Sequence, residues 1–159
     1  MLIFEFCAEN LTFIDKAIAA GAGRIELCDN LAVGGTTPSI GVINEAIKLT
    51  REKSVDLCVI IRPRGGDFVY TDLEVEAMLT DIRAAKEIGV SSFVLGALTP
   101  DGDLAEDAVA RMMEACGGRP VTLHRCIDVS RDLEATYRAA ARLGVDTVLT
   151  SGGAAACVD

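Results

Sequence analysis

Short apolar segments alternate with amphipathic segments along almost the whole chain, and this alternation constrains the fold more than any other feature. Apolar segments rich in β-branched residues predict six strands, at about 2–7, 24–28, 56–62, 92–96, 120–124 and 146–150. Segments with apolar residues at helical spacing predict five helices, at about 10–21, 40–47, 71–88, 104–116 and 132–143. Short strands that alternate with helices pair in parallel through right-handed crossovers.

Glycines and a capping motif mark the boundaries of several of these helices. Gly21, Gly89 and Gly144 each lie where a left-handed residue would end a helix, just before the next strand. Thr71 and Glu74 form the capping-box pattern that begins a helix. Asn10 is a candidate cap for the first helix.

Two folds fit this pattern, a (β/α)8 barrel and a doubly wound sheet. No Gly-x-Gly-x-x-Gly motif follows the first strand, which favours the barrel. A full barrel has eight strands and typically about 250 residues, whereas this chain has 159 residues. We therefore expect a single α/β domain over residues 1–159, a TIM (β/α)8-type barrel truncated after the sixth strand, with two open sheet edges.

Charge and cysteine usage narrow the functional classes. A formal net charge of −9 provides no positive surface for nucleic acid or for an anionic membrane. No segment approaches the about 20 apolar residues of a membrane-spanning helix, and the N-terminus lacks the basic region of a secretory signal. Because disulfide frameworks belong to small secreted domains, we expect reduced thiols in a cytoplasmic protein. These thiols belong to Cys7, Cys28, Cys58, Cys116, Cys126 and Cys157.

Ionisable residues inside the predicted strands mark a candidate site, because barrel strands should be apolar on the side that faces the helices. Four such residues each have a neighbour two positions later, which shares the same face of an extended strand. The pairs are Glu5 with Cys7, Glu26 with Cys28, Arg62 with Arg64, and His124 with Cys126. We expect all eight to point into the barrel, the second of each pair nearer the C-terminal mouth, where active sites of this fold lie.

These residues permit two chemistries. In the first, Glu26, Arg62 and His124 act on a small anionic substrate, with His124 as proton carrier because its ordinary pKa is near neutrality. The glycine-hydroxyl loops 34–37 and 150–153 are candidate phosphate sites in this interpretation.

In the second chemistry, two thiolates from Cys7 and Cys28, or three with Cys126, converge on one soft metal ion, Cu(I) or zinc. Purely structural roles compete with both interpretations. Buried Glu–Arg pairs, packed thiols and a core histidine occur in many proteins without any ligand.

Several segments resemble the CutC family, in the order in which the family has them. They are Arg24–Cys28, Gly34–Ser39, Ile61–Phe68, Thr122–Arg125 and Leu149–Gly152. Ile-Arg-Pro-Arg-Gly-Gly-Asp-Phe, at residues 61–68, is the most specific of them. The resemblance implies a cytoplasmic TIM-type barrel, often a homodimer, with a role in copper homeostasis and no assigned reaction.

The resemblance also suggests roles for individual residues. The family's proposed Cu(I)-binding thiols correspond to Cys7 and Cys28. Its polar cluster corresponds to Glu5, Glu26, Arg62, Arg64, Asp67, His124, Arg125 and Asp128. Where the family usually has His-Arg-Ala-Phe-Asp, this chain has His-Arg-Cys-Ile-Asp at 124–128, so the family offers no support for Cys126 as a ligand.

The sequence therefore predicts a copper homeostasis protein of the CutC type, which binds Cu(I) through Cys7 and Cys28. The alternative is an enzyme of unknown reaction with Glu26, Arg62 and His124 as catalytic residues. Its substrate would be bound by Glu5, Arg64, Asp67, Arg125 and Asp128. A third possibility is a fragment without function of its own.

Overall fold

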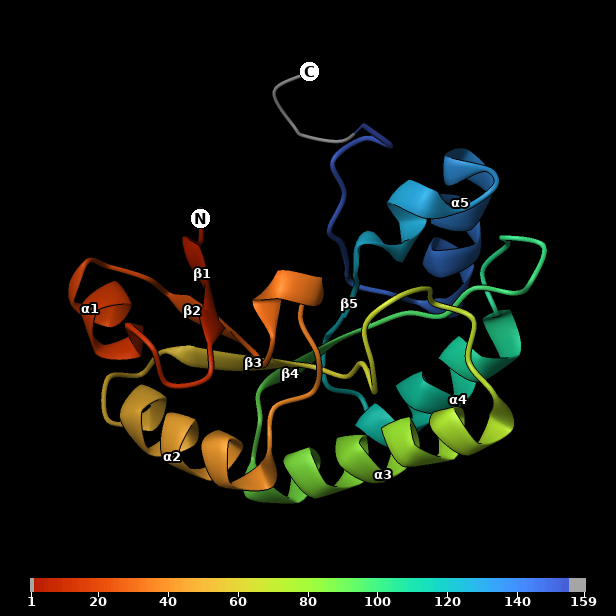
Figure 1. The fold of residues 1–159 in the computed structure, drawn as a ribbon. Helices are drawn as coiled ribbons and strands as arrows, with labels where there is room; N and C mark the ends of the chain where they lie inside the picture. The colour runs from red at the N-terminus through yellow and green to blue at the C-terminus, as the bar shows by residue number, and fades with distance from the viewer. Residues whose placement is uncertain (1, 155–159) are drawn as a thin grey trace.

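The computed structural model describes residues 2–154, which form six parallel strands connected through helices (Figure 1). The strands are β1 (Glu5–Glu9), β2 (Arg24–Cys28), β3 (Asp56–Ile60), β4 (Ser92–Leu95), β5 (Val121–Leu123) and β6 (Thr147–Val148). The α-helices are α1 (Ile14–Ala19), α2 (Ile40–Arg51), α3 (Asp72–Ile88), α4 (Glu106–Cys116) and α5 (Leu133–Leu143). Two 3-10 helices, η1 (Leu31–Val33) and η2 (Arg125–Val129), follow β2 and β5.

The strands lie in the sheet in the same order as in the chain, β1-β2-β3-β4-β5-β6. A doubly wound sheet would reverse its strand order partway, whereas a barrel does not. The sheet is curled and the helices lie along its outer side (Figure 1). The predicted barrel-type α/β fold with six strands is therefore confirmed. Within residues 2–154, β1 pairs only with β2 and β6 only with β5, so these two strands form the edges.

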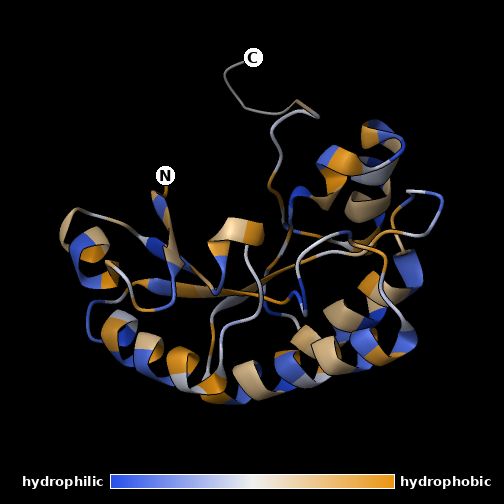
Figure 2. Ribbon diagram, in the orientation of Figure 1, coloured by the Kyte–Doolittle hydropathy of each residue, from blue (hydrophilic) through white to orange (hydrophobic). Residues whose placement is uncertain are grey.

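The two faces of the sheet carry two separate apolar clusters. Ile25 and Leu27 of β2 belong to the large core between the sheet and the helices. Cys28 of the same strand packs on the inner face in a small cluster with Cys58, Ile60 and Val94. This alternation follows from the two-residue period of a strand, and it confirms that Cys28 faces the inside of the curled sheet. Figure 2 shows the matching pattern: the strands are largely apolar, and the helices carry both polar and apolar residues.

Most helix boundaries agree with their capping signals. Thr71 and Glu74 form the predicted capping box at the start of α3, and Gly89 and Gly144 end α3 and α5 in the left-handed conformation. The prediction for the first helix was wrong at its start, because α1 begins at Ile14. Asn10 instead lies in the loop before α1, where its side-chain amide donates to Asp29 Oδ1 at 2.9 Å.

Several strands are shorter than predicted, and the early ends of β3 and β5 matter for the site. β3 ends at Ile60 and β5 at Leu123, so Arg62, Arg64 and Cys126 lie beyond the regular strands. None of the described helices is both long and apolar enough to cross a membrane. The described cysteines are free thiols, namely Cys7, Cys28, Cys58, Cys116 and Cys126. The sixth, Cys157, lies outside the described residues.

Replacing Gly96 by alanine should destabilise the fold, by about 1–3 kcal/mol. A Cβ at this position, directly after β4, would lie 2.6 Å from Cys126 Sγ and 2.8 Å from His124 Cε1. The matched control is Gly41→Ala in α2, where only Ser39 Oγ lies within 4 Å, at 3.9 Å. That change should stabilise by about 0.4–1 kcal/mol, because it restricts the unfolded chain. Urea unfolding of both variants measures the two effects, and equal effects of the same sign would contradict this packing.

Candidate functional site

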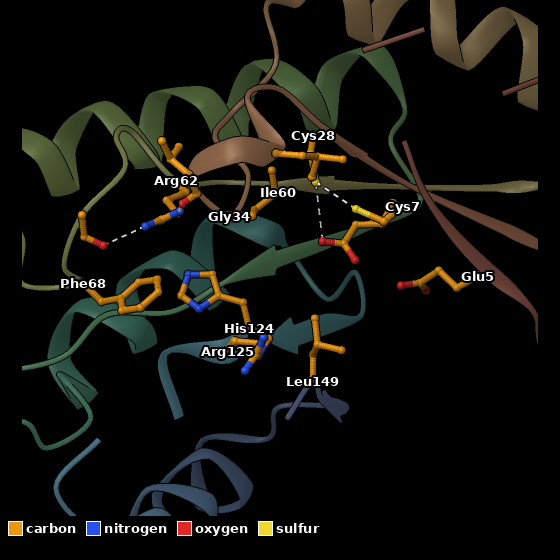
Figure 3. Close-up of a pocket in the computed structure, with 14 residues that line it drawn as sticks. Glu5, Cys7, Cys28, Gly34, Ile60, Arg62, Phe68, His124, Arg125 and Leu149 are labelled. Atoms are coloured by element: carbon orange, nitrogen blue, oxygen red, sulfur yellow. Dashed lines mark hydrogen bonds between the residues drawn. The ribbon is translucent and has the colours of Figure 1, made fainter. Parts of the chain in front are cut away.

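A pocket of about 610 Å³ opens on the inner side of the curled sheet, near the carboxyl ends of the strands. Residues from β1, β2, β3 and the loops after β2, β3, β5 and β6 line it (Figure 3). The predicted site residues among them are Glu5, Cys7, Glu26, Cys28, Arg62, His124 and Arg125. The other lining residues are Leu31, Val33, Gly34, Ile60, Gly66, Phe68 and Leu149. Strand parity thus places both residues of the Glu5–Cys7 and Glu26–Cys28 pairs inside, as predicted.

Two thiols and one carboxyl group meet where β1 and β2 lie side by side. The parallel register places Cys7 next to Glu26, and Cys28 lies on the same face two residues further along. The Cys7 and Cys28 sulfur atoms are 3.7 Å apart, and Cys28 Sγ lies 3.7 Å from Glu26 Oε1 (Figure 3). Ligand atoms of all three residues lie within 4.8 Å of one another, so a single metal ion could contact all of them.

Burial and mutual contact change the acidity of this cluster. Burial, together with the nearby charge of Glu5, raises the pKa of Glu26 to about 7. The hydrogen bond from Cys28 lowers the pKa of Cys7, because it stabilises the Cys7 thiolate. The contact with Cys7, followed by burial and the nearby charge of Glu26, raises the pKa of Cys28. Cys7 is therefore the first thiol of the pair to become a thiolate.

Arg62 is buried, 3% exposed, and is held by backbone carbonyl groups. Its Nη1 donates to the oxygens of Val33 at 2.7 Å and Gly35 at 3.0 Å, and its Nη2 donates to the oxygen of Gly66 at 2.8 Å. No carboxylate of residues 2–154 forms a salt bridge with it, and its Nε–H has no acceptor there. The guanidinium is thus rigidly positioned but lacks a negative partner among residues 2–154.

His124 is also buried, and its ring lies 4.8 Å from the ring of Phe68. Nδ1 accepts the backbone N–H of Cys126 at 3.3 Å, so the neutral ring carries its proton on Nε2. Burial, followed by the positive charge of Arg62, lowers the pKa of His124 to about 3. The assignment of His124 as a proton carrier assumed a pKa near neutrality, which this environment does not give.

Arg64 and Asp67 lie outside the pocket, contrary to the expectation that both belong to the polar cluster inside the barrel. The strand has ended before Pro63, so the two-residue period no longer applies at position 64. Arg64 instead pairs with Glu74 Oε1 at 2.5 Å and with Asp67 Oδ1 at 3.1 Å. These ion pairs attach the loop after β3 to the first turn of α3.

Asp128 and Cys126 do not line the pocket either. Cys126 lies in η2 and packs into the outer core, because β5 ends before it. Asp128 pairs with Arg125 at 2.8 Å and accepts the backbone N–H groups of Ser151 and Gly153. Although burial opposes it, this set of donors holds the pKa of Asp128 well below its usual range.

Both loops considered as phosphate sites are used within the chain. The N–H groups of loop 150–153 bind the carboxylate of Asp128, and loop 34–37 directs a carbonyl oxygen at Arg62. Phe68 and the carbonyl groups that hold Arg62 were not predicted as parts of the site. Phe68 could have been noticed, because it is an aromatic residue directly after Gly-Gly-Asp. The backbone carbonyl groups could not, because every residue has one.

Comparisons with known proteins agree on one family. The model of the CutC family matches residues 2–159. The family protein CutC of Enterococcus faecalis is 50% identical over 157 residues, which cover 97% of this chain and 75% of that protein. A human protein described as a copper homeostasis protein cutC homolog is 43% identical over 150 residues, 94% of this chain and 54% of its own length.

A solved structure of CutC from Streptococcus agalactiae superposes with a TM-score of 0.92 at 43% identity and covers 98% of this chain. This chain covers 75% of that structure and between about half and three quarters of the curated relatives named above. Family model, sequence identity and superposition lead to the same conclusion: the chain belongs to the CutC family.

Proposed function

We propose that this protein serves copper homeostasis by binding Cu(I) through Cys7 and Cys28. The observation that carries the proposal is the 3.7 Å separation of their sulfur atoms at one end of a pocket. The name of the human relative, a copper homeostasis protein cutC homolog, supports a role in copper homeostasis. The proposal also includes three properties that were expected from the sequence: a cytoplasmic location, a homodimer and a single domain.

The donor set fits a soft metal ion better than a hard one. Two thiolates favour Cu(I) or zinc over magnesium or calcium, which prefer oxygen ligands. Structural zinc sites usually have four protein ligands, whereas the cluster found among residues 2–154 consists of Cys7, Glu26 and Cys28. A small ligand set is consistent with an ion that is bound and passed on.

Exposure of the two thiols suggests how the ion enters. Cys7 is exposed on the edge strand β1, and Cys28 is buried behind it. The lowered pKa of Cys7 makes it the better first ligand, because a metal ion binds the thiolate and not the thiol. Cys28 then completes the pair, and Glu26 supplies an oxygen atom beside it.

An enzymatic role remains the second candidate, with a changed assignment of roles. Glu26, whose pKa is raised to about 7, suits proton transfer near neutrality better than His124 does. Arg62 would then bind the anionic part of the substrate, and His124 would donate a hydrogen bond as a neutral ring.

Serine at position 7 or 28 should weaken Cu(I) binding at least about tenfold, because loss of even an outer partner of a metal ligand typically costs about 10- to 100-fold in affinity. Anaerobic competition with a chromophoric Cu(I) chelator measures this for wild type, Cys7→Ser and Cys28→Ser. Cys116→Ala is the control, since Cys116 is buried in α4 away from the pocket. Wild-type affinity in both serine variants would refute the thiol site.

The single histidine should not titrate in the folded protein between pH 8 and pH 5. Its pKa is lowered from 6.5 to about 3, so the unfolded chain binds a proton in this window that the folded protein does not. His124 therefore costs stability as the pH falls below 6.5, by up to about 1.4 kcal/mol per pH unit. Glu26 has the opposite effect: it adds stability as the pH falls from about 7 to 4.5, because its pKa is higher in the folded protein than in the unfolded chain.

The NMR shift of the His124 Cε1–H measures the titration directly, without interference from Glu26. It should stay constant in the folded protein and titrate near pH 6.5 in urea. A midpoint between pH 6 and pH 7 in the folded protein would restore His124 as a proton carrier.

A further inference from the structure

The part of the pocket around Arg62 carries a positive charge that the described chain does not neutralise. Three carbonyl oxygens accept hydrogen bonds from the guanidinium, but these groups are dipoles and leave its full charge in place. A buried charge is normally paired, because removing it from water is costly. The other arginine of the pocket, Arg125, already pairs with Asp128.

Unused hydrogen-bond donors accompany this charge. Arg62 Nε–H and His124 Nε2–H are both buried and lack an acceptor within residues 2–154. Figure 3 shows the His124 ring directed toward the Arg62 guanidinium and the Phe68 ring, at the opposite end of the pocket from Glu5 and Cys7. Buried polar groups are rarely left unsatisfied in native proteins, so such a pair of donors in one pocket wall needs an acceptor.

We propose that this end of the pocket binds a small monocarboxylate, whose oxygen atoms accept hydrogen bonds from Arg62 and His124. One cation without a negative partner in the described part of the chain matches one negative charge, and Arg favours carboxylates because its N–H groups form a planar fork. Glu5 and Glu26 line the same pocket and would repel a dianionic phosphate more strongly. The backbone N–H groups of loop 150–153 that could bind a phosphate already bind Asp128.

Phe68 packs against both groups that carry the donors. Its ring lies 4.8 Å from the Arg62 guanidinium carbon and 4.8 Å from the His124 ring centre. Because both N–H groups are buried, binding of the carboxylate requires a neighbouring side chain to move, and Phe68 contacts both groups. Phe68 follows Gly65 and Gly66, and Gly66 has φ +87°, a conformation that favours glycine.

The carboxylate site does not depend on copper, since neither donor belongs to the thiol cluster. The test therefore uses metal-free protein, and its result is separate from that of the Cu(I) titration. Saturation-transfer NMR measures binding of acetate and butyrate, with acetamide as the uncharged match of acetate and inorganic phosphate as the competing anion.

Acetate or butyrate should bind with a Kd on the order of millimolar, as expected for so few atoms, and acetamide should not bind measurably. Arg62→Gln should weaken binding at least about tenfold, through loss of a charged hydrogen bond. Arg83→Gln, an exposed α3 arginine outside the pocket, removes the same charge and should leave binding unchanged.

Arg62 also holds two loops, so a second pair of variants keeps the test decisive if Arg62→Gln does not fold. His124→Phe should weaken binding several-fold, whereas His124→Gln, which keeps an N–H donor, should bind nearly as wild type does. Equal binding of acetate and acetamide, or no loss in His124→Phe, would overturn the proposal. Tighter binding of phosphate than of either carboxylate would overturn the assignment of the ligand class.

Discussion

The Arg62 guanidinium determines the shape of the pocket, because it connects two loops that share no regular secondary structure. It donates to carbonyl oxygens of Val33 and Gly35 in the loop after β2, and of Gly66 in the loop after β3. The backbone of Arg62 adds to this connection through Thr37, whose hydroxyl accepts its N–H at 2.8 Å. One buried side chain thus fixes a wall of the pocket and leaves it positively charged.

The inner face of the sheet was the part of the site that the sequence could predict. Along β2 the apolar residues Ile25 and Leu27 alternate with Glu26 and Cys28, and a strand with one helix-covered face allows only one orientation of this pattern. The parallel pairing of the strands followed from the alternation of strands and helices, because parallel neighbours need a crossover. Both predictions rest on strict periodicity, and both hold within the regular elements.

Periodicity failed where the strands end. Arg64 and Cys126 were expected inside, but each lies beyond the last paired residue of its strand, where a turn or a 3-10 helix sets the direction. The pKa of His124 could not be predicted from the sequence either. It depends on burial and on Arg62, which is 62 positions away in the sequence. The carbonyl groups that hold Arg62 belong to the backbone, so no side-chain type in the sequence indicates them.

The thiol pair bridges the edge strand β1 and its only neighbour among the described residues, β2. Parts of a folded domain can open locally at a lower free energy than the whole domain needs to unfold. Fraying of β1 would move Cys7 away from Cys28 while the buried part of the pocket stays intact. The lifetime of an ion held between the two sulfur atoms therefore depends on the stability of the hydrogen-bonded pairing of β1 with β2. Hydrogen exchange of the β1 amides measures this stability.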